Sequence, residues 1–272
     1  MVRTFEVEAG ALVRSWTDAS LAEASARLPP GSYTSLRTWG GSRVVRLQQH
    51  LARLEESLVL QGLPPARVPE AEARRALAAA LAECGQPESR LRLTFCPPRL
   101  FVSVEPFVPL PPSLYLQGAW CVCLPLERAN PRAKDTRFIA RSAAAYARLP
   151  AGAHEGLLLG PAGEVLEGLS SNFFAVSRGV LRSEDARALH GVTRGQVLEL
   201  ARDLLPVSLE PVRKAELDAL DEAFLTSASR GVLPVTRVDA VEIGDGRRGR
   251  VSLELGRRLE RLLEREAESL VG

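Results

Sequence analysis

Hydrophobic positions in the first third of the chain follow a helical period in two segments. Four leucines of residues 47–60 fall on one helical face, which predicts an amphipathic helix there. Pro69 suits a first helical turn and Gly85 is a typical helix end, so a second helix is predicted from Pro69 to Cys84. Around these helices, apolar runs predict strands over residues 33–38, 44–45, 91–95 and 100–104.

The rest of the chain is dominated by short apolar runs. They predict strands over residues 120–124, 156–159, 164–166, 172–176, 207–209 and 223–226. Helical spacing interrupts these strands in three places, over residues 138–148, 194–204 and 251–266. The mixture predicts an α/β (α+β) fold whose second half is rich in strands.

A proline-rich segment separates the two halves. Residues 106–112 contain four prolines, a density that neither a helix interior nor a central strand tolerates. At 272 residues the chain also exceeds one average domain. We therefore predict a small N-terminal α/β domain over residues 1–108, a linker over 109–115 and a larger β-rich domain over 116–272.

Composition and charge argue against several classes of partner. The net charge is +2, and no basic run is interleaved with aromatic residues as in nucleic-acid-binding proteins. No stretch approaches the roughly 20 apolar residues of a membrane span, and the N-terminus has no apolar signal core. The sequence therefore predicts a cytoplasmic protein with small-molecule partners.

The cysteines and histidines do not predict a metal site. Cys121 and Cys123 lack the CxxC spacing, and their alternation would place both thiols on one face of a strand. The three histidines, at positions 50, 154 and 190, are too scattered to complete a zinc site with them. We expect all four cysteines to be structural and predict no metal.

Lysine is scarce, since only Lys134 and Lys214 stand among the 35 lysines and arginines. A codon-level bias toward arginine would explain this scarcity without any chemistry. Arginine stays protonated, however, whereas a lysine amine can lose its proton and react with an aldehyde. Both lysines are therefore candidates for covalent chemistry, and composition does not choose between them.

Several further segments could bind a ligand, and each has an ordinary alternative. Residues 190–194 precede a helical run whose free N–H groups would suit a phosphate, although Thr193 could be a simple N-cap. Arg53 could clamp a phosphate or be solvated, and the hydroxyl-rich turn at 226–231 could hold a ligand or only turn the chain. Glu167 could hydrogen-bond a cationic ring nitrogen or face water.

In this order and spacing, four motifs resemble those of the class IV aminotransferases, the fold-type IV pyridoxal phosphate enzymes. The motifs are HxxRL at residues 50–54, ExxSSN at 167–172, GxTR at 191–194 and DEaFlTs at 221–227. Pro234 and Val235 follow the last motif, as they do in the family. The resemblance covers about residues 33–238 and implies the two-domain fold of that family, which includes branched-chain and D-amino acid aminotransferases and aminodeoxychorismate lyases.

The resemblance also implies a role for each matching residue. Lys134, 33 residues before Glu167, would bind the aldehyde of pyridoxal 5'-phosphate, and Lys214 would be a surface cation. Glu167 would pair with the pyridine nitrogen. The phosphate would be held by Arg53, the backbone of Val192 and Thr193, and the turn of Ser227, Ala228 and Ser229. The substrate pocket would include Tyr33, Arg37, Arg92 and Arg230.

Three departures from the aminotransferase pattern count against a branched-chain enzyme and leave the expected fold unchanged. Ala228 stands where aminotransferases usually have a threonine that binds phosphate. Phe138 or Ile139 stands near the place of a tyrosine in branched-chain enzymes. Arg230 and Gly231 replace a small residue and a glutamate.

The resemblance implies an aminotransferase, branched-chain-like or D-amino acid-like, that acts as a homodimer on an amino acid and a 2-oxo acid. The alternative is 4-amino-4-deoxychorismate lyase, which releases pyruvate and 4-aminobenzoate; the short chain and Ala228 favour it. A third interpretation is a non-catalytic protein that has kept the fold. The intact set of Lys134, Glu167 and Arg53 argues against that interpretation.

Overall fold

The computed structural model describes residues 1–270, and these residues form two compact units. The first unit contains Met1–Val108, Ala133–Arg141 and the described residues from Leu263 onwards. The second contains Pro109–Arg132 and Ser142–Leu262. Lys134 therefore belongs to the first unit, whereas the linear domain prediction assigned it to the second. The predicted linker at residues 109–115 stays a proposal for the domain limit along the sequence.

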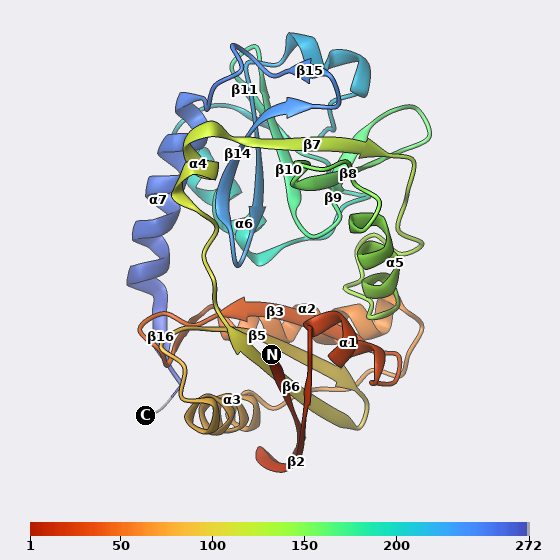
Figure 1. The fold of residues 1–272 in the computed structure, drawn as a ribbon, viewed down its shortest axis with the longest axis vertical. Helices are drawn as coiled ribbons and strands as arrows, with labels where there is room; N and C mark the ends of the chain where they lie inside the picture. The colour runs from red at the N-terminus through yellow and green to blue at the C-terminus, as the bar shows by residue number, and fades with distance from the viewer. Residues whose placement is uncertain (271–272) are drawn as a thin grey trace. The chain divides into compact units, whose positions relative to one another are not determined.

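The first unit is built on a five-stranded antiparallel sheet with the order β2-β1-β6-β5-β3. Its strands are β1 (Val2–Glu8), β2 (Ala11–Asp18), β3 (Ser32–Arg37), β5 (Ser89–Cys96) and β6 (Arg99–Pro106). Helices α2 (Leu47–Leu60) and α3 (Glu70–Cys84) pack against the sheet in one apolar core (Figure 1). The leucine stripe of α2 and the small alanines of α3 supply the helical side of that core.

Three short elements complete the first unit. Helix α1 (Leu21–Ala26) follows β2, and its N-cap Ser20 accepts a hydrogen bond from the backbone N–H of Glu23. Strand β4 (Arg43–Val45) pairs with β16 (Ala267–Ser269) near the end of the chain. Arg46 also forms an ion pair with Glu266, with 2.7 Å between nitrogen and oxygen. The start of α2 is thus tied to the C-terminal residues.

The second unit contains a nine-stranded mixed sheet with the order β12-β11-β10-β13-β14-β7-β8-β9, to which β15 adds beside β14. Its strands are β7 (Ala119–Leu124), β8 (Glu155–Leu159), β9 (Val165–Gly168), β10 (Asn172–Ser177), β11 (Val180–Arg182), β12 (Val207–Ser208), β13 (Glu222–Ser227), β14 (Gly231–Val238) and β15 (Val241–Glu242). Phe174 and Phe224 stack across β10 and β13 with ring centroids 5.0 Å apart. The strand-rich second half is confirmed.

The helices outside the first unit's core are short, apart from the last one. They are α4 (Pro112–Gln117), α5 (Arg137–Tyr146), α6 (Val192–Ala201), the 3-10 helix η1 (Lys214–Ala219) and α7 (Arg250–Glu266). Helices α5 and α7 have residues in both units. Glu222 caps α7, because its carboxylate accepts hydrogen bonds from the backbone N–H groups of Val251 and Ser252.

Several sequence predictions differ from the structure for physical reasons. The proline-rich segment was expected to exclude helix, yet Pro112 begins α4, because proline is tolerated in a first helical turn. Strand β14 was missed because it contains Pro234. Its pairing with β7 starts only at Val235, so the missing N–H costs no hydrogen bond there. Strand β2 was missed because most of its residues are exposed.

The cysteines show no sign of reactivity in the described residues. All four are free thiols, and no group of histidine, cysteine or carboxylate side chains in residues 1–270 could hold a metal ion. Burial raises the pKa of the Cys96 thiol to about 11, and it raises that of Cys121 well above its usual range. Protonated thiols are poor nucleophiles and ligands. Among the same residues, no helix is long and apolar enough to cross a membrane.

The turn that enters β3 leaves no room for a side chain at Gly31. A Cβ there would be closer to the Phe95 carbonyl oxygen than van der Waals contact allows, and Cys96 Sγ would be only 2.9 Å away. We predict that Gly31→Ala lowers the free energy of unfolding by about 1–3 kcal/mol in denaturant titrations. Gly195→Ala is the control, since its Cβ would meet open space in a helix and should not destabilise the protein. Equal stability of the two variants would contradict the packing argument.

Candidate functional site

Helix α2 buries a stripe of polar side chains beside its leucines. His50, Arg53 and Ser57 are spaced so that they share one helical face, and their exposed fractions are 3%, 8% and 0%. Arg53 is therefore not a solvated surface arginine, the alternative that the sequence left open. Buried polar groups require partners, and the contacts of this stripe define the polar cluster of the first unit.

Arg53 is held by a chain of two hydrogen bonds. Its Nη2 donates to Thr34 Oγ1 on β3 over 2.7 Å, and that oxygen lies 2.7 Å from His50 Nδ1. Burial and the nearby charges of Arg53 and Lys134 hold the pKa of His50 well below its usual range. The imidazole is consequently neutral and can accept the Thr34 hydroxyl proton. This leaves the Thr34 oxygen free to accept from Arg53.

Ser57 connects the same helix to Lys134. The Ser57 hydroxyl donates to the Arg53 carbonyl over 2.7 Å and accepts from the Lys134 backbone N–H over 3.0 Å. The Lys134 carbonyl in turn accepts from the backbone N–H of Tyr33, also over 3.0 Å. Both backbone groups of Lys134 are therefore fixed, one by α2 and the other by β3.

The Lys134 ammonium lies over an aromatic ring. Its Nζ is 4.7 Å from the centroid of Tyr33, and the Arg92 guanidinium carbon is 4.9 Å from the same centroid. Arg92 is buried and donates to the Leu21 carbonyl and to Ser25 Oγ on α1. Burial lowers the pKa of Arg92 from its ordinary value. Of the predicted substrate residues, Tyr33 thus lies beside Lys134, and Arg92 lies against the same Tyr33 ring.

Arg37 occupies a different environment from Tyr33 and Arg92. Its guanidinium carbon lies 3.6 Å from the ring centroid of Trp39 and 4.5 Å from that of Phe107. The planar cation is stacked between aromatic rings, an arrangement that stabilises a side chain without a ligand. The substrate role of Arg37 stays a prediction.

A second polar cluster surrounds Glu167, in the second unit. It is 2% exposed and lies at the end of β9, where it forms an ion pair with buried Arg128 over 2.8 Å. One of its oxygens also accepts from the backbone N–H of Leu189 over 3.1 Å and from Asn172 Nδ2 over 3.3 Å. The carboxylate does not face water, the alternative that the sequence left open.

Helix α6 begins at Val192, two residues earlier than predicted. Val192 and Thr193 of the GxTR motif therefore lie inside its first turn. Gly191 is the N-cap, and no described side chain caps this helix end, so Thr193 is not the N-cap. The first-turn N–H groups at Val192 and Thr193 have no carbonyl within the helix to bond. A Cβ at Gly191 would collide with Asn172, the same residue that contacts Glu167.

Two hydroxyls in the predicted phosphate turn are buried without a hydrogen-bond partner among the described residues. They are Thr226 Oγ1 and Ser227 Oγ, at the end of β13. An unsatisfied buried hydroxyl costs about 1–3 kcal/mol, so such groups are expected where a ligand completes the bonding. Ala228 lacks a hydroxyl, but the two residues before it supply two.

Arg230 is part of a network of ion-pair and hydrogen-bond contacts around buried Glu155. Its Nη1 lies 2.6 Å from an oxygen of Glu155, a carboxylate with 0% exposure. The Tyr146 hydroxyl also hydrogen-bonds Glu155, and Ser171 Oγ donates to it over 2.9 Å. Burial and the charge of Glu155 raise the pKa of Tyr146 above its usual range. The charge of Arg230 is balanced by Glu155, which weakens the predicted substrate role.

The structure thus groups the predicted residues into two sets and adds partners that the sequence analysis did not name. The added residues are Thr34, Ser57, Arg128 and Glu155. Arg128 lies only six positions before Lys134, but an arginine in a chain so rich in arginine gives no signal of its own. Lys214 is exposed and forms an ion pair with Asp239 over 2.6 Å, in agreement with its prediction as a surface cation.

Comparison with known proteins identifies the family. Residues 31–238 match the profile described as amino-transferase class IV. The chain belongs to the class IV aminotransferase family. Enzymes of this family use pyridoxal 5'-phosphate, so the expected family, enzyme class and cofactor are confirmed at that level.

Individual relatives and solved structures agree with this assignment. The branched-chain-amino-acid aminotransferase of Pseudomonas aeruginosa is 37% identical over 106 residues, which cover 38% of this chain and 34% of that protein. The chain spans about half or less of the length of the curated relatives that it matches.

Two solved structures cover nearly all of the chain. The branched-chain aminotransferase of the archaeon Thermoproteus uzoniensis, solved with norvaline, has a TM-score of 0.79 at 23% identity, covering 98% of this chain and 99% of that one. The 4-amino-4-deoxychorismate lyase of Pseudomonas aeruginosa has a TM-score of 0.75 at 26% identity, covering 96% of this chain and 99% of that one. The predicted fold is confirmed by these matches.

The lowered pKa of His50 predicts a pH-dependent stability. A folded-state pKa below the unfolded value of about 6.5 means that the unfolded chain binds the proton more readily. Neutral His50 therefore makes its full contribution to the free energy of unfolding above pH about 6.5. This contribution is lost as the pH falls below that value. His50→Gln should flatten the fall in melting temperature between pH about 7 and 5. His154→Gln, at an exposed histidine, is the matched control for the change of residue type. An unaltered slope in His50→Gln would contradict the assignment.

Arg128 and Glu167 form a buried ion pair. We therefore predict that substitutions of the two residues have non-additive effects on the free energy of unfolding. Arg128→Gln leaves a buried carboxylate without its cation and should lower the free energy of unfolding by about 3–5 kcal/mol. The double variant Arg128→Gln/Glu167→Gln removes both charges and should recover part of that loss. Denaturant titrations of the single and double variants provide the measurement. Strict additivity would show that the two side chains do not interact.

Proposed function

We propose that the chain catalyses transamination, moving an amino group between an amino acid and a 2-oxo acid, with pyridoxal 5'-phosphate as the cofactor. The observation that carries this proposal is the fixed position of Lys134, whose backbone is bonded to Ser57 and Tyr33. A lysine on a rigid backbone beside an aromatic ring suits a covalent bond to an aldehyde.

The residues present fit the cofactor. The hydroxyls of Thr226 and Ser227, which have no partner among the described residues, and the start of α6 suit the phosphate, together with buried Arg53. Glu167 would keep a proton on the pyridine nitrogen, and Arg128 and Leu189 hold this carboxylate in place. When bound, the cofactor supplies an aldehyde for the amine and a ring that accepts electrons.

This chain's own residues would then position and move protons. Lys134 Nζ would bind the cofactor and, once displaced by a substrate amine, carry the proton at the substrate Cα. Arg53 would balance the phosphate charge through a guanidinium already oriented by Thr34. Tyr33 and Arg92 would line the substrate side of Lys134.

The alternative reaction is the lyase reaction on 4-amino-4-deoxychorismate, with release of pyruvate and 4-aminobenzoate. Ala228 and the similarity to the Pseudomonas aeruginosa lyase favour it. Half-reactions against a panel of L- and D-amino acids would identify the amino donor and its stereochemistry. Pyruvate released from aminodeoxychorismate without a 2-oxo acid would instead select the lyase.

The proposal also includes the location, oligomeric state and partners of the protein. We propose a cytoplasmic homodimer whose partners are small amino and 2-oxo acids, with neither nucleic acid nor membrane among them. Sedimentation of the purified protein tests the dimer.

The two lysines provide a matched pair of variants. Lys134→Ala should abolish the visible absorption band of the lysine-bound cofactor and its sensitivity to borohydride, because the attacking amine is gone. Lys214→Arg should leave the band intact, since Lys214 pairs with Asp239 on the surface. A borohydride-sensitive band that persists in Lys134→Ala would refute the assignment of this lysine.

A further inference from the structure

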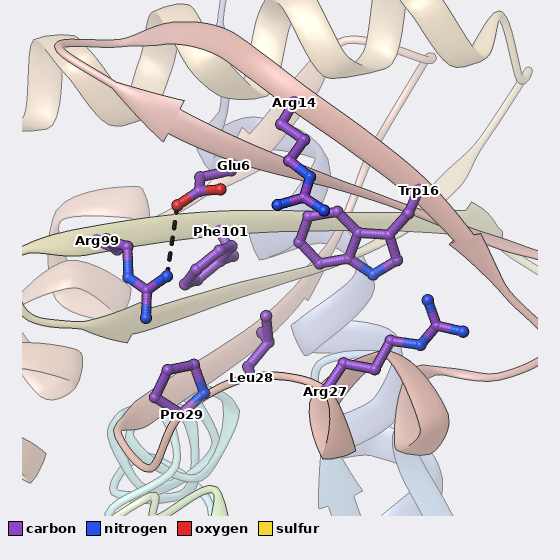
Figure 2. Close-up of a pocket in the computed structure, with 8 residues that line it drawn as sticks. All are labelled: Glu6, Arg14, Trp16, Arg27, Leu28, Pro29, Arg99 and Phe101. Carbon is purple, nitrogen blue, oxygen red and sulfur yellow. Dashed lines mark ion pairs between the residues drawn. The ribbon is translucent and has the colours of Figure 1, made fainter.

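The first unit has a pocket of about 210 Å³, and Figure 2 shows the side chains that line it. Glu6, one of these residues, pairs with Phe101 on β6 in the strand register. Phe101 pairs with Thr94 on β5, which in turn pairs with Tyr33 on β3. Directly paired residues point to the same face of a sheet, so the pocket shares the face that carries Tyr33. It therefore belongs to the proposed substrate side of the first unit and is not a separate site.

The second unit contains a further polar cluster, built around the buried carboxylate of Glu155 at the start of β8. One oxygen of this carboxylate lies 2.6 Å from Arg230 Nη1, and it accepts from Ser171 Oγ over 2.9 Å and from Ser170 Oγ over 3.1 Å. The other oxygen accepts from the Tyr146 hydroxyl at the end of α5. We call these residues the Glu155 cluster, and they come from separate segments of the chain.

Arg230 is held in this cluster through both its side chain and its backbone. Its Nη2 donates to Ser170 Oγ over 2.9 Å while its Nη1 donates to Glu155, so both ends of the guanidinium are engaged. The Arg230 carbonyl accepts from the Tyr115 hydroxyl on α4 over 2.7 Å. Burial alone would lower the pKa of Arg230, but its contacts with Glu155 and Tyr146 raise that pKa above the ordinary value. Arg230 therefore stays charged although its side chain is only 20% exposed.

Arg230 closes the turn that is proposed to bind the phosphate. Ser227 and Gly231 are the last paired residues of β13 and β14, so Arg230 is the final residue of the loop between them. Its backbone N–H donates to the Ser227 carbonyl over 3.3 Å. Ala228 and Ser229 complete the loop and have short side chains. The long side chain of Arg230 is therefore what ties this loop to β8.

The Glu155 cluster also joins this turn to a second motif. Ser170 and Ser171 belong to the ExxSSN motif that begins at Glu167, and both donate to Glu155. The packing there is tight, because a Cβ at Gly168 would lie only 3.0 Å from the Glu155 side chain and would collide with Ser171. One buried carboxylate thus fixes the turn and the ExxSSN segment with respect to each other.

We propose that Arg230 is a positioning residue, whose ion pair with Glu155 holds the turn after β13 in the conformation that binds the cofactor's phosphate. This inference rests on the proposed function, in which the hydroxyls of Thr226 and Ser227 bind that phosphate. Hydrogen-bond donors bind an anion well when neighbouring contacts already hold them in place. The aminotransferase pattern has a small residue at position 230, so this anchor is a feature in which the chain departs from that pattern.

Equilibrium dialysis of the purified chain against pyridoxal 5'-phosphate tests the proposal. Arg230→Gln removes the anchor, and we expect the apparent dissociation constant of the cofactor to rise about tenfold or more. The melting temperature should fall as well, because Glu155 is left buried without its cation.

The double variant Arg230→Gln/Glu155→Gln separates the position of the turn from the stability of the protein. It removes both charges, so the melting temperature should recover part of its fall. The net charge around the turn is then the same as in the unaltered protein. The dissociation constant of the cofactor should nevertheless stay about tenfold or more above that of the unaltered protein, because the turn has lost its anchor.

Amide hydrogen exchange reports the position of the turn without any cofactor. In the double variant, residues 226–231 should exchange about tenfold or more faster than in the unaltered protein. The core strand β10 should be accelerated by a smaller factor, since most of the stability is retained. Equal acceleration of the turn and of β10 would show a purely structural role and would overturn the proposal.

Arg148→Gln is the matched control, since Arg148 is an exposed arginine of the same unit. It should bind the cofactor as the unaltered protein does. The proposal is overturned if Arg230→Gln keeps the original affinity, or if the affinity of the double variant recovers together with its melting temperature. The proposed function survives either result. Failure of the unaltered protein to bind the cofactor would instead refute the proposed function, and this proposal with it.

Discussion

The polar cluster of the first unit depends on one constraint, the need to satisfy the polar side chains that α2 buries. His50, Arg53 and Ser57 lie on the buried face beside the leucines, where an unpaired group would be costly. Their partners are the groups that function would require, namely Thr34 for Arg53 and the Lys134 backbone for Ser57. The packing of one amphipathic helix therefore orients both Arg53, the proposed phosphate-binding cation, and Lys134, the proposed reactive lysine.

In the second unit, buried carboxylates are satisfied mainly by ion pairs. Glu155 and Glu167 are almost fully buried, and each is paired with one arginine and with hydrogen-bond donors. The two ion pairs have different neighbours. Glu167 also contacts Asn172 beside the start of α6, which couples the carboxylate proposed to bind the ring to the helix end proposed to bind the phosphate. Arg230 and Glu155 instead join with Tyr146 and stabilise the fold around the turn.

Long periodic elements could be predicted from the sequence, whereas those with weak or contrary signals could not. Helix α2 was placed correctly because its leucines repeat at the helical period. Strand β2 is mostly exposed and β14 contains a proline, so neither shows the usual alternation. Lys134 and Glu167 were found through motif spacing. Arg128 and Ser57 were not, because a partner of a buried group is fixed by the tertiary fold and leaves no local pattern.

Alanine at position 228, in place of the usual threonine, leaves other hydrogen-bond donors at the proposed phosphate site. Two buried hydroxyls at the same strand end, on Thr226 and Ser227, have no partner in the described part of the chain. A phosphate has several acceptor oxygens, so it is bound by a set of donors rather than by one residue. Helix α6 contributes free N–H groups independently of any side chain. In the proposed site the substitution therefore redistributes the donors, and it bears less on the proposed cofactor binding than on the choice between the two proposed reactions.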